Sequence, residues 1–266
     1  MTSSPPGSHR HQAHGGSPRE LLELDAAVTG AYLDEAITLI RAAASGPPAT
    51  IVDVGAGTGV GTRALAAAFP DAEIIAIDGS ADMTAGIAGA GTGHLRAVTA
   101  DLDDGWPQVG AADVVWASGS LHHLADPLAF LHTARAHLRG GGVLAIIEMA
   151  HQPRFLQSGL DDRIEAIMRA KGANAFPDWT DTIIAAGFEM RGRHSVPIVV
   201  AHPTPTSRAY AQAWLTRVRS GLADDLGADD LATIDALLGD SADSLRHRPD
   251  LQVQSTRLIW IATAER

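Results

Sequence analysis

Hydrophobic positions along the chain follow two patterns that alternate. Short apolar runs rich in Val, Ile and Ala each end at a polar residue or turn, which predicts strands. The runs between them carry apolar residues at helical spacing and predict helices. This alternation is typical of an α/β domain. In chain order the predicted elements are strand 51–54, helix 62–69, strand 72–77, helix 81–90, strand 94–99, strand 112–117, helix 127–138 and strand 143–147.

Helical patterns flank this central stretch on both sides. Residues 18–44 predict one or two amphipathic helices, and residues 151–187 continue with helical spacing and aromatic residues. Two further helices, 206–222 and 228–238, separate a strand within 188–200 from a final strand, 251–264. A connection of this length is typical of a lid over a binding pocket.

We therefore expect a single domain over 18–266 behind a disordered tail, 1–17. The tail contains Ser, Pro, Gly and three histidines, His9, His11 and His14; because it offers no fixed geometry, a solvated tail is favoured over a metal site. Within the domain we expect a helical cap at 18–45, a cofactor-binding core at 49–150, and helical substrate or lid regions at 151–187 and 206–247.

A glycine-rich loop follows the first strand, in the run TIVDVGAGTGVG from 50 to 61. Glycine at every second position lets a ligand lie against backbone amides. The dinucleotide fingerprint GxGxxG fails because Val60 stands where its third glycine belongs, and no GK[ST] follows for a phosphate loop. The pattern left is DxGxGxG, which begins at Asp53. The alternative is that Asp53 caps the turn and the glycines form only a tight bend.

Acidic and imidazole side chains stand at the ends of other predicted strands. Asp78 ends the second strand about twenty residues after the loop, where a carboxylate accepts hydrogen bonds from ribose hydroxyls. His122 and His123 follow the fourth strand, and Glu148 ends the fifth. A carboxylate beside an imidazole fixes its tautomer and raises its basicity, as for a general base and its partner. The alternative is that the first histidine packs on the cofactor and the second is a buried donor.

Together these motifs resemble the class I S-adenosylmethionine-dependent methyltransferases. The DxGxGxG loop is similar to the first motif of this family, and LHHLADP at 121–127 to the fourth motif of its small-molecule members of the ubiquinone-biosynthesis type. RGGGVLAIIE at 139–148 resembles the family's LRPGGxLxIxE, with Gly140 where Pro is usual. The resemblance implies an α/β/α sandwich of three layers around a Rossmann-like, mostly parallel sheet of seven strands in the order 3-2-1-4-5-7-6.

The resemblance also implies roles for individual residues. Asp101 would accept the adenine amino group, Leu102 would pack on the ring, and Met83 would touch the adenosine. The N-terminal extension would cover the pocket, so Tyr32 either reaches it or packs only on the sheet. One of the two histidines would act as the base with Glu148 as its partner, and His122 is preferred over His123. Asp126 would cap the next helix. The residues expected to hold S-adenosylmethionine are Asp53, Gly55, Ala56, Gly57, Thr58, Gly59, Asp78, Gly79, Met83, Asp101, Leu102 and Ser118.

Composition limits the partners. The net charge of −11 argues against nucleic acid, the lack of cysteine removes thiolate chemistry, and no apolar run is long enough for a membrane span. We expect a cytoplasmic bacterial enzyme that needs no metal and methylates an oxygen of a small molecule in secondary metabolism. Aromatic residues indicate a partly hydrophobic acceptor, although at helical spacing they more often form core: Phe155, Phe176, Trp179, Tyr210 and Trp214.

Several alternatives stay open. Methylation of a nitrogen or carbon atom would depend less on removing a proton from the acceptor. A silent protein would keep the same motifs and bind the cofactor without catalysing a reaction. A nicotinamide oxidoreductase is disfavoured by Val60 and by the lack of a catalytic Tyr and Lys pair. A homodimer is neither required nor excluded.

Overall fold

The protein is built on one sheet of seven strands in the order β3-β2-β1-β4-β5-β7-β6, which confirms the expected order. A computed structural model describes residues 17–89, 94–156, 158–172 and 176–265. β7 runs antiparallel to both of its neighbours, and the other pairings are parallel. Within the described residues, no helix is long and apolar enough to cross a membrane.

The elements follow the expected succession with shifts of a few residues at their ends. The strands are β1 (Thr50–Val54), β2 (Glu73–Asp78), β3 (Leu95–Thr99), β4 (Ala112–Ser118), β5 (Leu138–Met149), β6 (Phe188–Val200) and β7 (Val253–Ala264). The helices are α1 (Pro18–Thr29), α2 (Tyr32–Ala43), α3 (Val60–Ala68), α4 (Ala81–Ala88), the 3-10 turn η1 (Leu121–His123), α5 (Pro127–His137), α6 (Gly159–Ala170), α7 (Thr180–Ala185), α8 (Pro205–Gly221) and α9 (Ala228–Leu238).

Helices cover both faces of the sheet, because alternate strand residues point to opposite sides. On one face, Val52 and Val115 join the apolar sides of α5 and α7 in a buried cluster. On the other face, Ile51 and Val114 pack with α2 and α3. As expected, the Asp126 side chain caps α5, accepting a hydrogen bond from the Ala129 amide at 2.9 Å.

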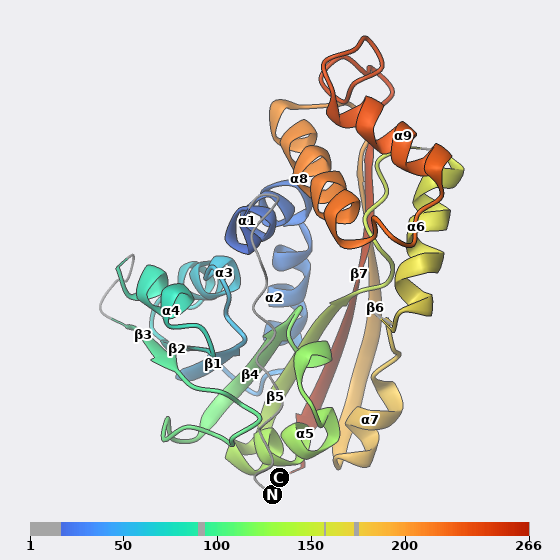
Figure 1. The fold of residues 1–266 in the computed structure, drawn as a ribbon. Helices are drawn as coiled ribbons and strands as arrows, with labels where there is room; N and C mark the ends of the chain where they lie inside the picture. Colours follow the sequence, from blue (N-terminus) through green and yellow to red (C-terminus); the bar gives the residue numbers. More distant parts are fainter. Residues whose placement is uncertain (1–16, 90–93, 157, 173–175, 266) are drawn as a thin grey trace, which may run out of the picture.

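A third cluster lies around the end of the β6–β7 hairpin, where α6, α8 and α9 gather (Figure 1). Four of the five aromatic residues considered for the acceptor are buried: Phe155, Tyr210 and Trp214 lie in this cluster, and Trp179 lies under α7. Their interpretation as core residues is therefore correct. The fifth, Phe176, is half-buried and has a φ of 44°.

Two segment boundaries differ from the sequence prediction. Residues 139–142, expected as a turn, belong to β5, which begins at Leu138 and pairs there with Ala112 before a register shift. The expected tail, 1–17, lies outside the described residues except for Ser17. The Ser17 side chain accepts a hydrogen bond from the Glu20 amide and so begins α1.

A buried ion pair attaches α1 to the sheet. The Arg257 guanidinium on β7 donates to Asp25 on α1 at 2.6 Å and to Thr29 at 3.1 Å. The Tyr210 hydroxyl on α8 donates to the other oxygen of Asp25 at 2.6 Å. Because Arg257 is only 4% exposed, its charge depends on this single carboxylate.

We expect Asp25→Ala to destabilise the fold by about 3 kcal/mol, because it leaves a buried guanidinium without its counterion. Urea unfolding of the variant measures this loss. Arg246→Ala is the control, since it removes an ion pair whose two side chains are 61% and 86% exposed, and it should cost less than about 1 kcal/mol. Equal losses of unfolding free energy in the two variants would contradict the role of Asp25 as the counterion of the buried guanidinium.

Candidate active site

The glycine loop turns sharply between β1 and α3. Gly55 and Gly59 have φ values of 66° and 79°, a backbone region that side chains rarely adopt. A Cβ on Gly55 would lie 2.4 Å from Cβ of Ser120, so the loop also packs too closely for a larger residue. Within the loop, the Gly59 amide donates to the Ala56 carbonyl at 2.8 Å. The loop therefore follows a fixed course past the end of β4.

Asp78 joins the end of β2 to this loop. One of its oxygens accepts a hydrogen bond from the Gly57 amide at 2.8 Å, and the other accepts one from Ser80 at 2.8 Å. Asp101 follows β3 at the same edge of the sheet; it is exposed, and its carboxylate accepts from the Asp103 amide at 3.0 Å. Leu102 packs against the first core cluster. Acidic side chains thus line the edge beside the loop, as predicted.

Asp53 lies inside the protein instead of on this open edge. Its side chain is 2% exposed and accepts a hydrogen bond from the Thr62 hydroxyl at 2.6 Å. Burial raises the pKa of Asp53 to about 7, although the Thr62 hydrogen bond opposes this. The sequence predicts that Asp53 helps to hold the cofactor; in the structure its carboxylate contacts Thr62 on α3, beneath the loop.

His122 and Glu148 lie together where β4 and β5 end. His122 Nδ1 is 2.7 Å from Glu148 Oε2, and Glu148 Oε1 accepts a hydrogen bond from the Leu121 amide at 3.0 Å. The side chains are 21% and 7% exposed, respectively. When Nδ1 donates to the carboxylate, Nε2 carries the lone pair and can accept a proton. The sequence predicted that Glu148 stands one strand away from the histidines, and the structure brings it to His122.

His123 occupies the next position but has a different environment. Its ring centroid is 4.0 Å from that of His122, and the residue is exposed. Partial burial, together with the neighbouring His122, lowers the pKa of His123 below its usual range, while Glu148 acts in the opposite direction. No hydrogen bond orients its ring within the described residues, which makes His123 the weaker candidate for a base.

The N-terminal helices cover the loop. On α1, Leu22 approaches to 3.8 Å of the position that a Cβ on Gly57 would take, and Arg19 donates to the Asp82 carbonyl on α4 at 3.0 Å. On α2, the Tyr32 hydroxyl is 3.3 Å from Ser118 Oγ at the end of β4. Tyr32 therefore packs on the sheet and contacts the end of β4.

Two buried polar residues that follow β4 and β5 were not predicted from the sequence. Ser120 is 8% exposed and lies against Gly55, and Gln152, four residues after Glu148, is 3% exposed. Among the residues that the structure describes, neither side chain has a hydrogen-bond partner. Serine and glutamine are common in loops, so only their burial identifies them.

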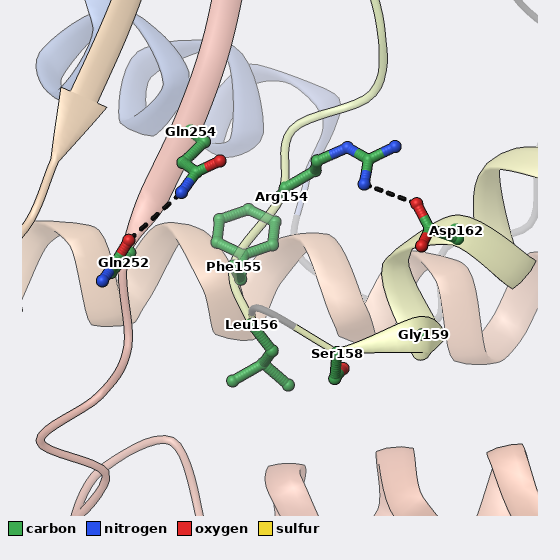
Figure 2. Close-up of a pocket in the computed structure, with 8 residues that line it drawn as sticks. All are labelled: Arg154, Phe155, Leu156, Ser158, Gly159, Asp162, Gln252 and Gln254. Atoms are coloured by element: carbon green, nitrogen blue, oxygen red, sulfur yellow. Dashed lines mark hydrogen bonds and ion pairs between the residues drawn. The ribbon is translucent and has the colours of Figure 1, made fainter.

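A pocket of about 510 Å³ lies elsewhere, between the start of α6 and the first part of β7 (Figure 2). In Figure 2, Arg154 points toward Asp162, and the Gln254 side chain on β7 donates a hydrogen bond to the side chain of Gln252, just before the strand. None of the residues predicted to bind the cofactor or to act in catalysis lines this pocket, although Phe155, one of the aromatic residues considered for the acceptor, does. Its polar groups bond to one another, which distinguishes it from the edge that carries the glycine loop.

Comparison with known proteins agrees with this architecture. Residues 52–144 match the family model described as a methyltransferase domain. The fold is similar to that of the Haemonchus contortus phosphoethanolamine N-methyltransferase 2 in complex with phosphomonomethylethanolamine and S-adenosylhomocysteine, with a TM-score of 0.55, 12% identity, and coverage of 94% of this chain and 58% of that chain. Residues 52–144 thus form a methyltransferase domain, and the strand order and motifs agree with those of the class I S-adenosylmethionine-dependent methyltransferases.

Its relatives in sequence are of the small-molecule type. The trans-aconitate 2-methyltransferase of Deinococcus radiodurans is 36% identical over 100 residues, which are 38% of each chain. That of Yersinia pseudotuberculosis is 27% identical over 240 residues, covering 82% of this chain and 88% of the relative. The stronger similarity thus spans less than two-fifths of the relative.

Asp53 makes stability depend on pH. Its pKa is about 7 in the folded protein against 3.8 in the unfolded chain, so folding binds a proton between these values and stability falls as pH rises from about 4 to 7. Asp53→Asn should remove this decline. The contribution of Asp53 changes the free energy of unfolding by at most about 4 kcal/mol between pH 4 and pH 8. Urea unfolding at both values tests this; parallel pH profiles for the two proteins would show that Asp53 does not titrate there.

Proposed function

We propose that this protein transfers the methyl group of S-adenosylmethionine to an oxygen atom of a small molecule. The observation that carries the proposal is the His122–Glu148 pair at the edge of the sheet that also bears the glycine loop. This arrangement supports a base held beside a cofactor cradle. When bound, S-adenosylmethionine supplies a sulfonium-activated methyl group, and the protein aligns the acceptor with it.

The residues of the edge fit such a cofactor. The backbone of Gly55 to Gly59 would lie along the amino-acid part of the cofactor. Glycine is needed at position 55 because a Cβ there would collide with Ser120. Asp78 would accept hydrogen bonds from the ribose hydroxyls, since a carboxylate has lone pairs beyond the two already used. Asp101, Leu102 and Met83 would surround the adenine, with Gly79, Ala56 and Thr58 beside them and Ser118 closing the site.

The kind of oxygen decides what His122 does. A hydroxyl acceptor keeps its proton at neutral pH, so His122 Nε2 would remove it while Glu148 holds the ring. A carboxylate acceptor is already ionised. The trans-aconitate 2-methyltransferases named above favour this second candidate, because their named substrate is a carboxylic acid. In that case His122 would orient the acceptor without removing a proton.

The sequence leaves two alternatives to an O-methyltransferase, and the same experiment tests them. An N- or C-methyltransferase would use the same cofactor residues. A silent cofactor-binding protein would bind S-adenosylmethionine and form no methylated product with any acceptor.

We expect the wild type, incubated with S-adenosylmethionine and a panel that includes trans-aconitate, phenols, alcohols and amines, to methylate an oxygen acceptor. Mass spectrometry of the products and release of S-adenosylhomocysteine measure this. With a hydroxyl acceptor, His122→Asn should lower kcat by about 10²–10⁴-fold. With a carboxylate acceptor the loss should stay within about tenfold.

Glu148→Gln serves as the companion variant, because it keeps the shape of the side chain and removes its charge. For a hydroxyl acceptor it should lower kcat in the same direction as His122→Asn. Methylated product from amines alone would replace the oxygen proposal, and cofactor binding without any product would favour the silent protein.

A further inference from the structure

The chain bulges immediately after β5. Pairing with β7 continues to Met149 opposite Arg257, and the Ala150 amide donates to the Thr256 carbonyl at 2.9 Å. It resumes where Arg154 bridges Gln254. Residues 151–153 therefore face Ser255 alone, so the strand carries extra residues here. Bulges of this kind change the direction of side chains and are common beside active sites.

The side chains of the bulge differ in how they are held. His151 is fixed, with Nδ1 2.7 Å from the Gln152 carbonyl oxygen and Nε2 3.2 Å from Thr256 Oγ1. Gln152 is 3% exposed, yet neither Nε2 nor Oε1 of its amide has a hydrogen-bond partner among the described residues. The backbone at the bulge is thus ordered by its neighbours, while the amide that it buries is unused.

An unused buried amide is costly. The group offers two donors and an acceptor, and folded proteins pair nearly all such atoms. Leaving them unpaired forfeits the hydrogen bonds that water supplies in the unfolded chain. An apolar side chain of similar length would avoid this cost at a site that needs only packing. The unpaired amide is therefore best explained by a partner that is not part of the chain.

The position of Gln152 indicates which partner. Along the sheet edge, the glycine loop follows β1, His122 follows β4, and Glu148 with the bulge follows β5. Adjacent strands are about 4.8 Å apart, so β5 ends about 10 Å from β1. Ser120, whose buried hydroxyl also has no hydrogen-bond partner among the described residues, lies against Gly55 on the loop side. Gln152 follows the strand on the other side of β4, where an acceptor would approach His122.

We propose that Gln152 positions the methyl acceptor by hydrogen bonds from its side-chain amide to a carboxyl, carboxamide or hydroxyl group of that molecule. This rests on the proposed function and adds a recognition element to it. His122 and Glu148 act at the reacting oxygen, whereas Gln152 holds a second polar group of the acceptor. The preferred acceptor therefore carries at least two polar groups.

Gln152→Met tests the proposal with three measurements. In the ligand-free protein it should raise Tm by about 2–4 °C, because it removes an unpaired buried amide and keeps its volume. It should raise KM at least tenfold for the acceptor that the wild type methylates, with trans-aconitate as the first probe. The Kd for S-adenosylhomocysteine should stay within twofold of the wild type. Gln212→Met, the same change at an exposed position of α8, is the control and should alter none of the three values.

A fall in Tm would overturn the proposal, because it would show that the amide, directly or through a bound water molecule, holds the ligand-free fold together. An unchanged KM would overturn it as well. If the wild type binds S-adenosylhomocysteine but methylates no acceptor, the proposed function fails separately. The Tm comparison then decides by itself whether the amide is reserved for a ligand or serves the fold.

Discussion

The parallel register of the central strands is the constraint on which the site depends. Val54 pairs with Ile77 on one side and with Ala117 on the other, and Ser118 pairs with Ile147. Strands that run in the same direction with this register end at the same level. The residues that follow them are therefore gathered at one edge, although they are separated by up to about a hundred positions in the chain.

This edge is completed by an element that the sheet itself does not provide. Helix α1 crosses the glycine loop because Asp25 ties it to Arg257 on β7 and to Tyr210 on α8. A buried ion pair contributes little net stability compared with apolar packing. Its value here is geometric, since it fixes the helix that carries Leu22 against Gly57 and links α8 to the same carboxylate.

The sequence predicted well what depends on local pattern. Strand 51–54, the glycine loop and Asp78 were placed correctly because hydrophobic period and turn chemistry act over a few residues. The pairing of His122 with Glu148 was anticipated because strand order brings the two ends together. The predicted start of β5 differs from the observed one, since Gly140 to Gly142 read as a turn but are part of β5, where they lie in the register shift between Leu138 and Val143.

Features that depend on distant contacts could not be predicted. Asp25 and Arg257 are 232 positions apart, and nothing near either residue indicates the other. The burial of Asp53 follows from Thr62 and α3, and the unpaired amide of Gln152 follows from a bulge that only the pairing of β5 with β7 defines. Such residues require the three-dimensional structure because burial and partnership are properties of the whole fold.

Calorimetric titration with S-adenosylmethionine, S-adenosylhomocysteine and NADH, on the wild type and on Asp78→Ala, measures whether this edge of the sheet binds the cofactor. We expect the first two ligands to bind the wild type and NADH not to bind. The substitution should remove the binding, because the ribose hydroxyls lose their acceptor. Absence of binding, or a preference for NADH, would contradict the assignment of this edge to S-adenosylmethionine and every role derived from it.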